Sequence, residues 1–198
     1  KKRCIFRSDI LKVILASASE RRQELLARLV EKFTIKVSKF DEKIVKYKGD
    51  ISQYVQDIAY GKALDVLEDT SEDAIIIASD TVVSIKNKIL GKPKDKQDAF
   101  SMLKELSGKT HIVCTGIVLI NTTNNKVLKT SEITEVKFSS LSDSEIEEYI
   151  KTGEPLDKAG AYGIQGKGGI FVEEIHGCYY NVVGLPLNKL RYLLKEII

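Results

Sequence analysis

Strand patterns and helix patterns follow one another along this chain in an order that restricts its fold class. Apolar runs predict strands over Val13 to Ala16 and Ala74 to Ala78. Two longer strands, His111 to Asn121 and Lys126 to Phe138, flank a turn at Thr122 to Asn125. Because helices and strands alternate early and hairpins fill the middle, we expect a mixed α/β sheet in one domain.

Local boundary signals predict the remaining elements. Capping residues predict three helices: Ser52 to Glu68, Asp95 to Leu106, and Ser142 to Ile150. Leucines at helical spacing predict one helix after Ser19 and another that carries Leu187 to Ile197. Shorter strand patterns cover three segments: Phe33 to Val37, Val82 to Leu90 with a turn at Asn87, and Ile170 to Glu173.

Charge and composition argue against several classes of protein, among them nucleic-acid-binding and membrane-spanning proteins. The 198 residues include 31 Lys and Arg against 28 Asp and Glu, and the two signs are interleaved, so no basic stripe for nucleic acid is expected. The apolar runs are strand-sized, which argues against a membrane span. Three Cys without a C-x-x-C pair indicate reduced thiols in the cytoplasm. We expect an N-terminal extension or tag remnant over residues 1–11 and a single domain over 12–198.

Ser17, Ser19, Arg21 and Arg22 lie where a strand gives way to a helix. Free backbone N–H groups, two hydroxyls and two guanidiniums at such a place suit a phosphate. The alternative is an ordinary helix cap, formed by Ser19 or by Ser17 with Glu20, beside two solvated arginines.

Two acidic positions are candidates for metal binding or general-base catalysis. Asp80 follows the buried strand Ala74 to Ala78, and the strand is expected to end at Ser79 to Thr81. A carboxylate held there can bind a hard cation or accept a proton from water, although an isolated Asp more often caps its own turn. Glu42, in a charged loop, is a second carboxylate that could share a metal with Asp80.

Three lysines are candidates for phosphate contacts. Lys92 stands in a turn constrained by Gly91 and Pro93, Lys62 lies on the helix after the charged loop, and Lys158 follows Asp157. The alternative for each lysine is a solvent-exposed side chain that takes no part in binding or catalysis.

Glycines are concentrated in the segment from Gly153 to Gly166, which also contains Asp157, Lys158 and Gln165. This density suggests a backbone that approaches a ligand closely. The segment is followed by a strand and matches neither the P-loop nor the dinucleotide-binding motif. His111 and His176 lack a second ligand at metal-binding spacing, and Cys114 reads as a core thiol.

Six blocks together resemble the Maf family of nucleoside triphosphate pyrophosphatases. They are Leu15 to Arg22, Ser79 to Val83, Leu90 to Pro93, Leu106 to His111, the glycine-rich segment, and Asn181 to Leu187. The resemblance spans about residues 12 to 198 and implies a twisted, mixed central sheet flanked by helices with a cleft, similar to inosine triphosphate pyrophosphatases.

The resemblance also implies a reaction and its residues. The family splits nucleoside triphosphates between the α- and β-phosphates with Mg²⁺ or Mn²⁺, which releases a monophosphate and pyrophosphate. The implied catalytic residues are Asp80, as general base or metal-organising carboxylate, with Lys92, Lys62 and Glu42; Asp80 and Glu42 would hold the metal. The implied and candidate substrate contacts are Ser17, Ser19, Arg21, Arg22, Thr81, Asp157, Lys158 and Gln165.

Subgroups of the family differ where the base is held. Arg21, Thr81 and Gln165 are of the type that acts on dTTP and UTP, and modified pyrimidine nucleotides are further expected substrates. The alternatives are the 7-methyl-GTP type and a nucleotide-binding regulator of septum formation. A homodimer is expected from the family. Glu20, where Pro is usual, and Cys178, where Asp or Ser is common, depart from the pattern.

Overall fold

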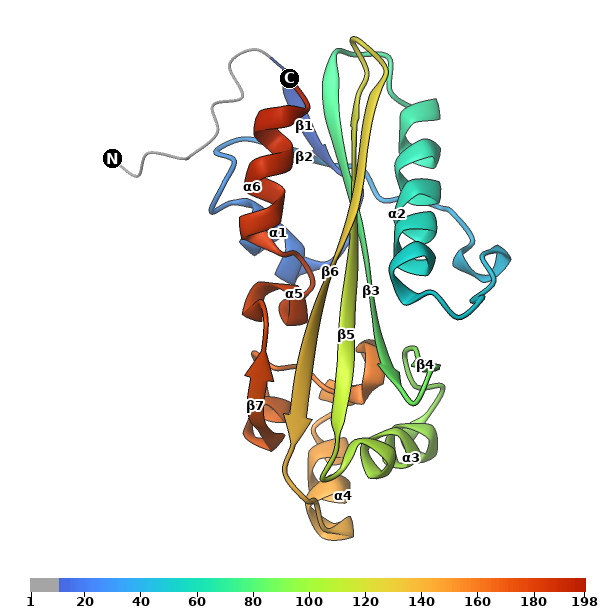
Figure 1. The fold of residues 1–198 in the computed structure, drawn as a ribbon, viewed down its shortest axis with the longest axis vertical. Helices are drawn as coiled ribbons and strands as arrows, with labels where there is room; N and C mark the ends of the chain where they lie inside the picture. Colours follow the sequence, from blue (N-terminus) through green and yellow to red (C-terminus); the bar gives the residue numbers. More distant parts are fainter. Residues whose placement is uncertain (1–10) are drawn as a thin grey trace. The chain divides into compact units, whose positions relative to one another are not determined.

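The computed structural model describes residues 11–198 (Figure 1). The predicted extension over residues 1–11 therefore lies outside the described residues, apart from residue 11. The described chain divides into two compact units, which are treated separately below. Unit 1 comprises residues 11–80, 115–132 and 184–198, and unit 2 comprises 81–114 and 133–183.

A mixed seven-stranded sheet confirms the predicted α/β class. Its strands are β1 (Lys12–Leu15), β2 (Thr34–Ile35), β3 (Ala74–Ile85), β4 (Lys88–Leu90), β5 (Thr110–Asn121), β6 (Lys126–Phe138) and β7 (Val172–His176). They follow the order β2-β1-β3-β5-β6-β7, with β4 paired to β3. β1 runs parallel to β2 and β3, whereas the pairs β3–β4 and β6–β7 are antiparallel.

Six α-helices and four short 3₁₀ helices complete the described structure. The α-helices are α1 (Glu20–Leu26), α2 (Ile51–Glu68), α3 (Lys96–Leu106), α4 (Asp143–Lys151), α5 (Tyr179–Val183) and α6 (Leu187–Glu196). The 3₁₀ helices are η1 (Glu42–Ile44), η2 (Glu154–Asp157), η3 (Ala159–Ala161) and η4 (Lys167–Phe171). No helix within residues 11–198 is both long and apolar enough to cross a membrane.

In unit 1, α2 packs on one face of the strands, and α1 and α6 lie on the opposite side in Figure 1. Ala74, Ile76 and Ala78 of β3 share one buried cluster with Ala59 and Ala63 of α2. Side chains two residues apart on a strand point to the same face, so this alternation assigns one face of β3 to α2. Small side chains on both elements allow the helix to approach the strand closely.

Unit 2 has its own core, in which aromatic rings meet edge to face. The ring centroids of Phe138 and Tyr162 lie 4.7 Å apart, and those of Tyr149 and Phe171 lie 5.1 Å apart. Edge-to-face contacts between aromatic rings add to the free energy gained by burying them. These rings join α4 to the glycine-rich segment and β6.

Four predicted boundaries need correction. Asp50, and not Ser52, caps α2, because its side chain accepts a hydrogen bond from Gln53 N at 3.0 Å. β3 continues through Asp80 to Ile85 and does not end at Ser79 to Thr81. β2 covers only Thr34–Ile35, and β7 begins at Val172. The predicted turn at Asn87 is confirmed, with positive φ angles at Lys86 and Asn87.

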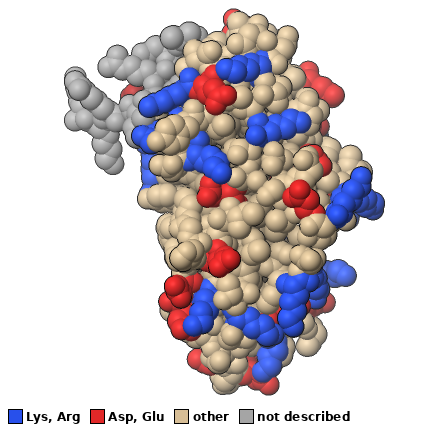
Figure 2. Space-filling model, viewed as in Figure 1, with Lys and Arg blue, Asp and Glu red and all other residues tan. Residues whose placement is uncertain are grey.

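Charged side chains of both signs are interspersed over the face shown in Figure 2. The mixture follows from the sequence, in which Lys and Arg alternate with Asp and Glu. Opposite charges at this density partly cancel each other's field at a distance.

Candidate active site

The alternation along β3 directs Asp80 towards α2. Asp80 continues the series of Ala74, Ile76 and Ala78, whose side chains face that helix. On α2, Lys62 extends its ammonium so that Nζ lies 2.7 Å from Asp80 Oδ1. The Asp80 carboxylate is therefore held by a strand interior and by a direct ion pair.

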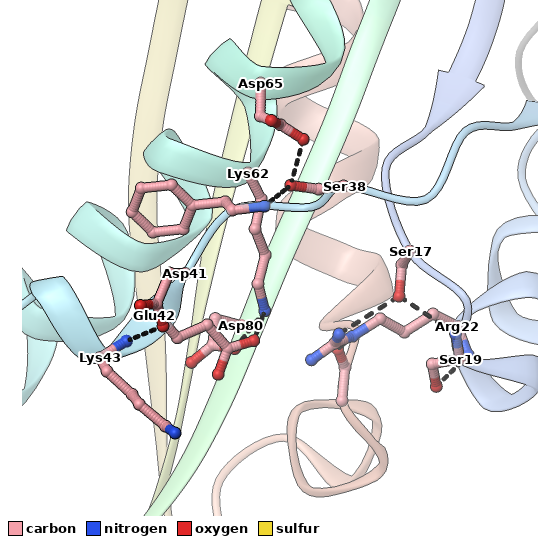
Figure 3. A network of polar contacts seen from close by, with 12 residues as sticks. Ser17, Ser19, Arg22, Ser38, Asp41, Glu42, Lys43, Lys62, Asp65 and Asp80 are labelled. Atoms are coloured by element: carbon pink, nitrogen blue, oxygen red, sulfur yellow. Dashed lines mark hydrogen bonds and ion pairs between the residues drawn. The ribbon is translucent and has the colours of Figure 1, made fainter.

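Lys62 also reaches a second carboxylate. Its Nζ lies 2.7 Å from Glu42 Oε1 in η1, so one ammonium bridges two acidic side chains from separate elements (Figure 3). The side chains of Lys62 and Asp80 are only 13% and 10% exposed, whereas that of Glu42 is 56% exposed. The structure thus brings Lys62, a candidate phosphate contact, together with Glu42 and Asp80, which were expected to share a metal.

Contacts with α2 fix the loop that carries Glu42. Ser38 Oγ and Lys39 N donate to Asp65 Oδ2 at 2.8 and 2.7 Å, and these hydrogen bonds lower the pKa of Asp65. A Cβ atom at Gly61 would lie 2.2 Å from Cζ of Phe40, so the aromatic ring rests directly on the helix backbone. The loop before Glu42 is therefore packed against the turn of α2 that carries Lys62.

The two carboxylates of this triad are chemically suited to a hard divalent cation. Within residues 11–198, no three His, Cys, Asp or Glu side chains form a metal-binding cluster. Glu42 and Asp80 nevertheless converge on one positive charge, that of Lys62. Mg²⁺ in proteins typically takes one or two carboxylates and completes its shell with water and substrate phosphate. Glu42 and Asp80 supply carboxylate oxygens of the kind that such an ion takes.

The predicted phosphate site contains a genuine helix cap. Ser19 caps α1, and its Oγ accepts a hydrogen bond from Arg22 N at 3.5 Å. Ser17 Oγ accepts from Ser19 N at 3.2 Å and from Arg22 Nη1 at 3.4 Å. The capping alternative is therefore correct for Ser19, while phosphate binding by these side chains stays a prediction.

Arg22 is not the solvated arginine of that alternative. Its Nε donates to the carbonyl oxygen of Gly184 at 2.9 Å, and Ser79 Oγ donates to the same oxygen at 3.3 Å. Burial lowers the pKa of Arg22, while the negative charge of Asp80 opposes this effect. Arg21 is its neighbour on α1 and is half-buried.

Two groups near these residues were missed from the sequence. The Gly184 carbonyl belongs to the Asn181 to Leu187 block, which signalled family resemblance but no role. Tyr54 was not singled out, yet burial, together with the charges of Asp80 and Glu42, raises the pKa of its hydroxyl. The only feature of the sequence that could have pointed to Tyr54 was its position on the same predicted helix as Lys62.

Unit 2 carries the other predicted site residues. Lys158 Nζ contacts Asp157 Oδ1 at 2.7 Å and donates to the Glu154 carbonyl oxygen at 3.0 Å. Lys92 is exposed in the turn after β4, and Gly91 in the same turn accepts a hydrogen bond from Gly160 N at 3.1 Å. Thr81 lies in β3, and Gln165 is exposed between η3 and η4.

Several glycines in and just after the glycine-rich segment lie directly against other side chains of this protein. A Cβ atom at Gly166 would lie 2.4 Å from Glu154 Oε1, and one at Gly168 would lie 2.5 Å from the Tyr149 hydroxyl oxygen. Gly160, at a φ of +68°, would likewise meet Val83. At these positions the close neighbours are protein atoms, and the close approach of this segment to a ligand stays a prediction.

Comparisons with known proteins agree with this fold and these motifs. A family model described as "Maf-like protein" matches residues 12–197. A Clostridium beijerinckii protein named dTTP/UTP pyrophosphatase is 65% identical over 187 residues, which cover 94% of this chain and 100% of that protein. A protein of the same name from Clostridium botulinum, strain Alaska E43, is 63% identical and is matched over 95% and 100% of the two chains.

Solved structures share the fold at low sequence identity. A HAM1 protein from Coxiella burnetii superposes with a TM-score of 0.52 at 17% identity, over 94% of this chain and 100% of that one. The Ham1 protein of Staphylococcus aureus gives a TM-score of 0.52 at 12% identity, over 93% and 98%. These likenesses support the predicted fold class alone. Since the family model spans nearly all of the described residues and the relatives match along their whole length, this chain belongs to the Maf family.

Proposed function

We propose that this chain hydrolyses dTTP and UTP to the nucleoside monophosphate and pyrophosphate. Relatives with more than 60% identity over their full length carry the name of that activity. Arg21, Thr81 and Gln165 are also the residue types that the family resemblance associates with pyrimidine substrates. A Gln amide can both donate and accept, as O4 and N3–H of thymine or uracil require.

The observation that carries the proposal is the Glu42–Lys62–Asp80 triad. Hydrolysis at the α-phosphorus needs positive charge to neutralise the phosphates and a carboxylate to accept a proton from the attacking water. The water oxygen forms a new bond to the α-phosphorus, the bond from that phosphorus to the α,β-bridging oxygen breaks, and pyrophosphate leaves. Asp80, held at 2.7 Å by Lys62, accepts the proton of the water.

Positive side chains bind the phosphate chain in this scheme. Arg22 and Lys62 are already oriented by Gly184 and by the two carboxylates. Arg21, with the Ser17 and Ser19 hydroxyls, would add a further cation and hydrogen-bond donors, and phosphate contacts by Lys92 and Lys158 stay predictions. Glu42 and Asp80 would hold Mg²⁺ or Mn²⁺, which supplies charge neutralisation of the triphosphate when bound. A cytoplasmic location and a homodimer stay predictions.

The proposal is tested with the purified chain and a panel of nucleoside triphosphates, with and without Mg²⁺ or Mn²⁺. We expect monophosphate and pyrophosphate from dTTP and UTP only with metal. Nucleotide binding without pyrophosphate release would contradict the proposal and favour the regulatory alternative. Hydrolysis confined to 7-methyl-GTP would place the chain in the other subgroup.

Variants test the roles of single residues. Asp80→Asn should remove most turnover and leave the fold intact, because the amide keeps the shape of the side chain and Lys62 keeps its ion pair with Glu42. Asp57→Asn, an exposed change on α2, serves as the matched control. Gln165→Glu should lower hydrolysis of dTTP and UTP more than that of purine nucleotides. Parent-like activity of Asp80→Asn would refute the general-base assignment, and an equal loss on all substrates would refute base recognition by Gln165.

A further inference from the structure

The carboxylate of Glu154 accepts three hydrogen bonds from groups of unit 2. Its Oε1 accepts hydrogen bonds from the Tyr149 hydroxyl at 2.8 Å and from Gly168 N at 3.2 Å. Its Oε2 accepts one from Lys167 N at 2.9 Å. Burial would raise the pKa of Glu154, but these hydrogen bonds outweigh burial and lower it. The charged form is thus the one that the surrounding donors favour.

Tyr149 extends this arrangement to the other end of the same segment. Its hydroxyl, which donates to Glu154, also accepts a hydrogen bond from Gly163 N at 3.2 Å. The ring is buried on α4, a helix whose start is fixed by a capping box between Ser142 and Glu145. Glu154 and Tyr149 therefore hold the backbone at Gly163 on one side and at Lys167 and Gly168 on the other.

Gln165 lies between these two fixed points. It is exposed, so its own side chain does little to fix the conformation of the backbone around it. Gly166 and Gly168 allow the backbone to lie against Glu154 and Tyr149, because a Cβ at either position would fall within 2.5 Å of an oxygen atom of those side chains. The segment is shaped by two side chains that lie before it in the sequence.

We propose that Glu154 is a positioning residue whose carboxylate, together with the Tyr149 hydroxyl, holds residues 163–168 so that Gln165 is presented to the nucleotide base. This inference rests on the proposed function, in which Gln165 recognises the pyrimidine. Glu154 acts through the loop and contacts no reacting atom.

Two variants weaken the arrangement with little change of shape. Glu154→Gln keeps the size of the side chain, but either orientation of its amide sets the NH₂ group against a backbone N–H, that of Gly168 or that of Lys167. Tyr149→Phe removes the hydroxyl that links Glu154 to Gly163. Glu148→Gln is the matched control, because Glu148 is exposed on α4 and pairs only with Lys151 among the described contacts of its carboxylate.

The readouts separate base recognition from phosphate binding and from folding. KM and kcat are measured for dTTP, and an inhibition constant is measured for inorganic tripolyphosphate, which has the phosphate chain without a base. Amide hydrogen exchange is measured over residues 163–168. We expect Glu154→Gln and Tyr149→Phe to speed this exchange and to raise KM for dTTP roughly tenfold, the effect of one lost hydrogen bond to a charged group. The tripolyphosphate constant should not change, and Glu148→Gln should behave like the parent.

A Gln165→Ala background provides the decisive comparison. If Glu154 acts through Gln165, then Glu154→Gln adds no further rise in KM in that background. The inference is overturned if exchange accelerates while KM for dTTP stays constant, if the tripolyphosphate constant rises equally, or if the two effects on KM add. A parent chain that releases no pyrophosphate would refute the proposed function instead, while the exchange measurement would still report whether Glu154 holds the loop.

Discussion

Arg22 Nε donates a hydrogen bond to the carbonyl oxygen of Gly184 at 2.9 Å, although the two residues are 162 positions apart in the sequence. The same guanidinium reaches Ser17 Oγ through Nη1 at 3.4 Å. One planar group on α1 thus contacts Ser17, in the segment after β1, and Gly184, in the segment before α6. This geometry depends on several donors in fixed directions, which a lysine ammonium on a flexible stem does not provide.

Arg22→Lys therefore tests whether the orientation of the guanidinium matters beyond its charge. We expect KM for dTTP to rise about tenfold, because a charge-assisted hydrogen bond contributes about 1.5–3 kcal/mol. Steady-state kinetics on the purified variant checks this, with Arg28→Lys at the exposed end of the same segment as control. An unchanged KM would mean that positive charge alone suffices at this position.

Glu42→Gln tests the second carboxylate of the triad. The substitution removes one negative charge from the pair that flanks Lys62, so the Mg²⁺ concentration for half-maximal activity should rise about tenfold. A metal titration of dTTP hydrolysis measures this concentration, and Glu68→Gln on the exposed end of α2 is the control. Identical metal titrations for the parent and Glu42→Gln would remove Glu42 from the metal site.

Gly61→Ala tests whether Phe40 sets the position of Glu42. Alanine in a helix gains about 1 kcal/mol over glycine, but its Cβ would lie within 2.5 Å of three ring atoms of Phe40. We expect the ring to be displaced, with little net change in the free energy of unfolding and several-fold weaker activation by Mg²⁺. Phe40→Leu in the same background removes the ring and should restore part of the activation. A variant that keeps parent-like activation would show that the loop moves independently of the ring.

His111 predicts a dependence of stability on pH. Burial lowers the pKa of His111 to about 4, while its Nε2 shares a hydrogen bond with the Tyr162 hydroxyl at 2.8 Å. Below about pH 6.5 the unfolded chain binds the proton first, so the free energy of unfolding falls as the pH drops from about 6.5 to about 4.

Urea unfolding at pH 7.0 and 5.0 measures this effect. Between these values the parent should lose about 2 kcal/mol more than His111→Gln, which has no group to protonate. Equal losses in the parent and His111→Gln would assign the acid sensitivity to other groups.

Elements with strong local signals were predictable from the sequence. The hairpin of β5 and β6 and the Asp95 cap of α3 match because turn and capping residues act on their immediate neighbours. The predicted end of β3 came too early, because Ser79, Asp80 and Thr81 interrupt an apolar run. The strand continues there because Asp80 is satisfied by Lys62, 18 positions earlier, and no local pattern reveals that partner.

The same limit applies to the site. Asp80, Lys62 and Glu42 were identifiable, and Glu42 was expected to share a metal with Asp80. The contact of both carboxylates with Lys62, however, depends on α2 packing on β3. Glu154 lay inside a segment that was already singled out, yet nothing in its neighbours shows that its carboxylate turns back to Lys167 and Gly168. These residues meet their partners only in the folded chain, and their spacing along the sequence does not reveal those contacts.

β3 is continuous through Asp80, so the number of residues in this strand determines the face from which the Asp80 carboxylate emerges. Because side chains alternate along an extended backbone, inserting one amino acid between Ala78 and Ser79 would exchange the sides on which the Ser79 hydroxyl and the Asp80 carboxylate emerge. An insertion of two would restore both. Tolerance of this stretch to length changes should therefore follow an odd–even rule, whatever the identity of the added residues.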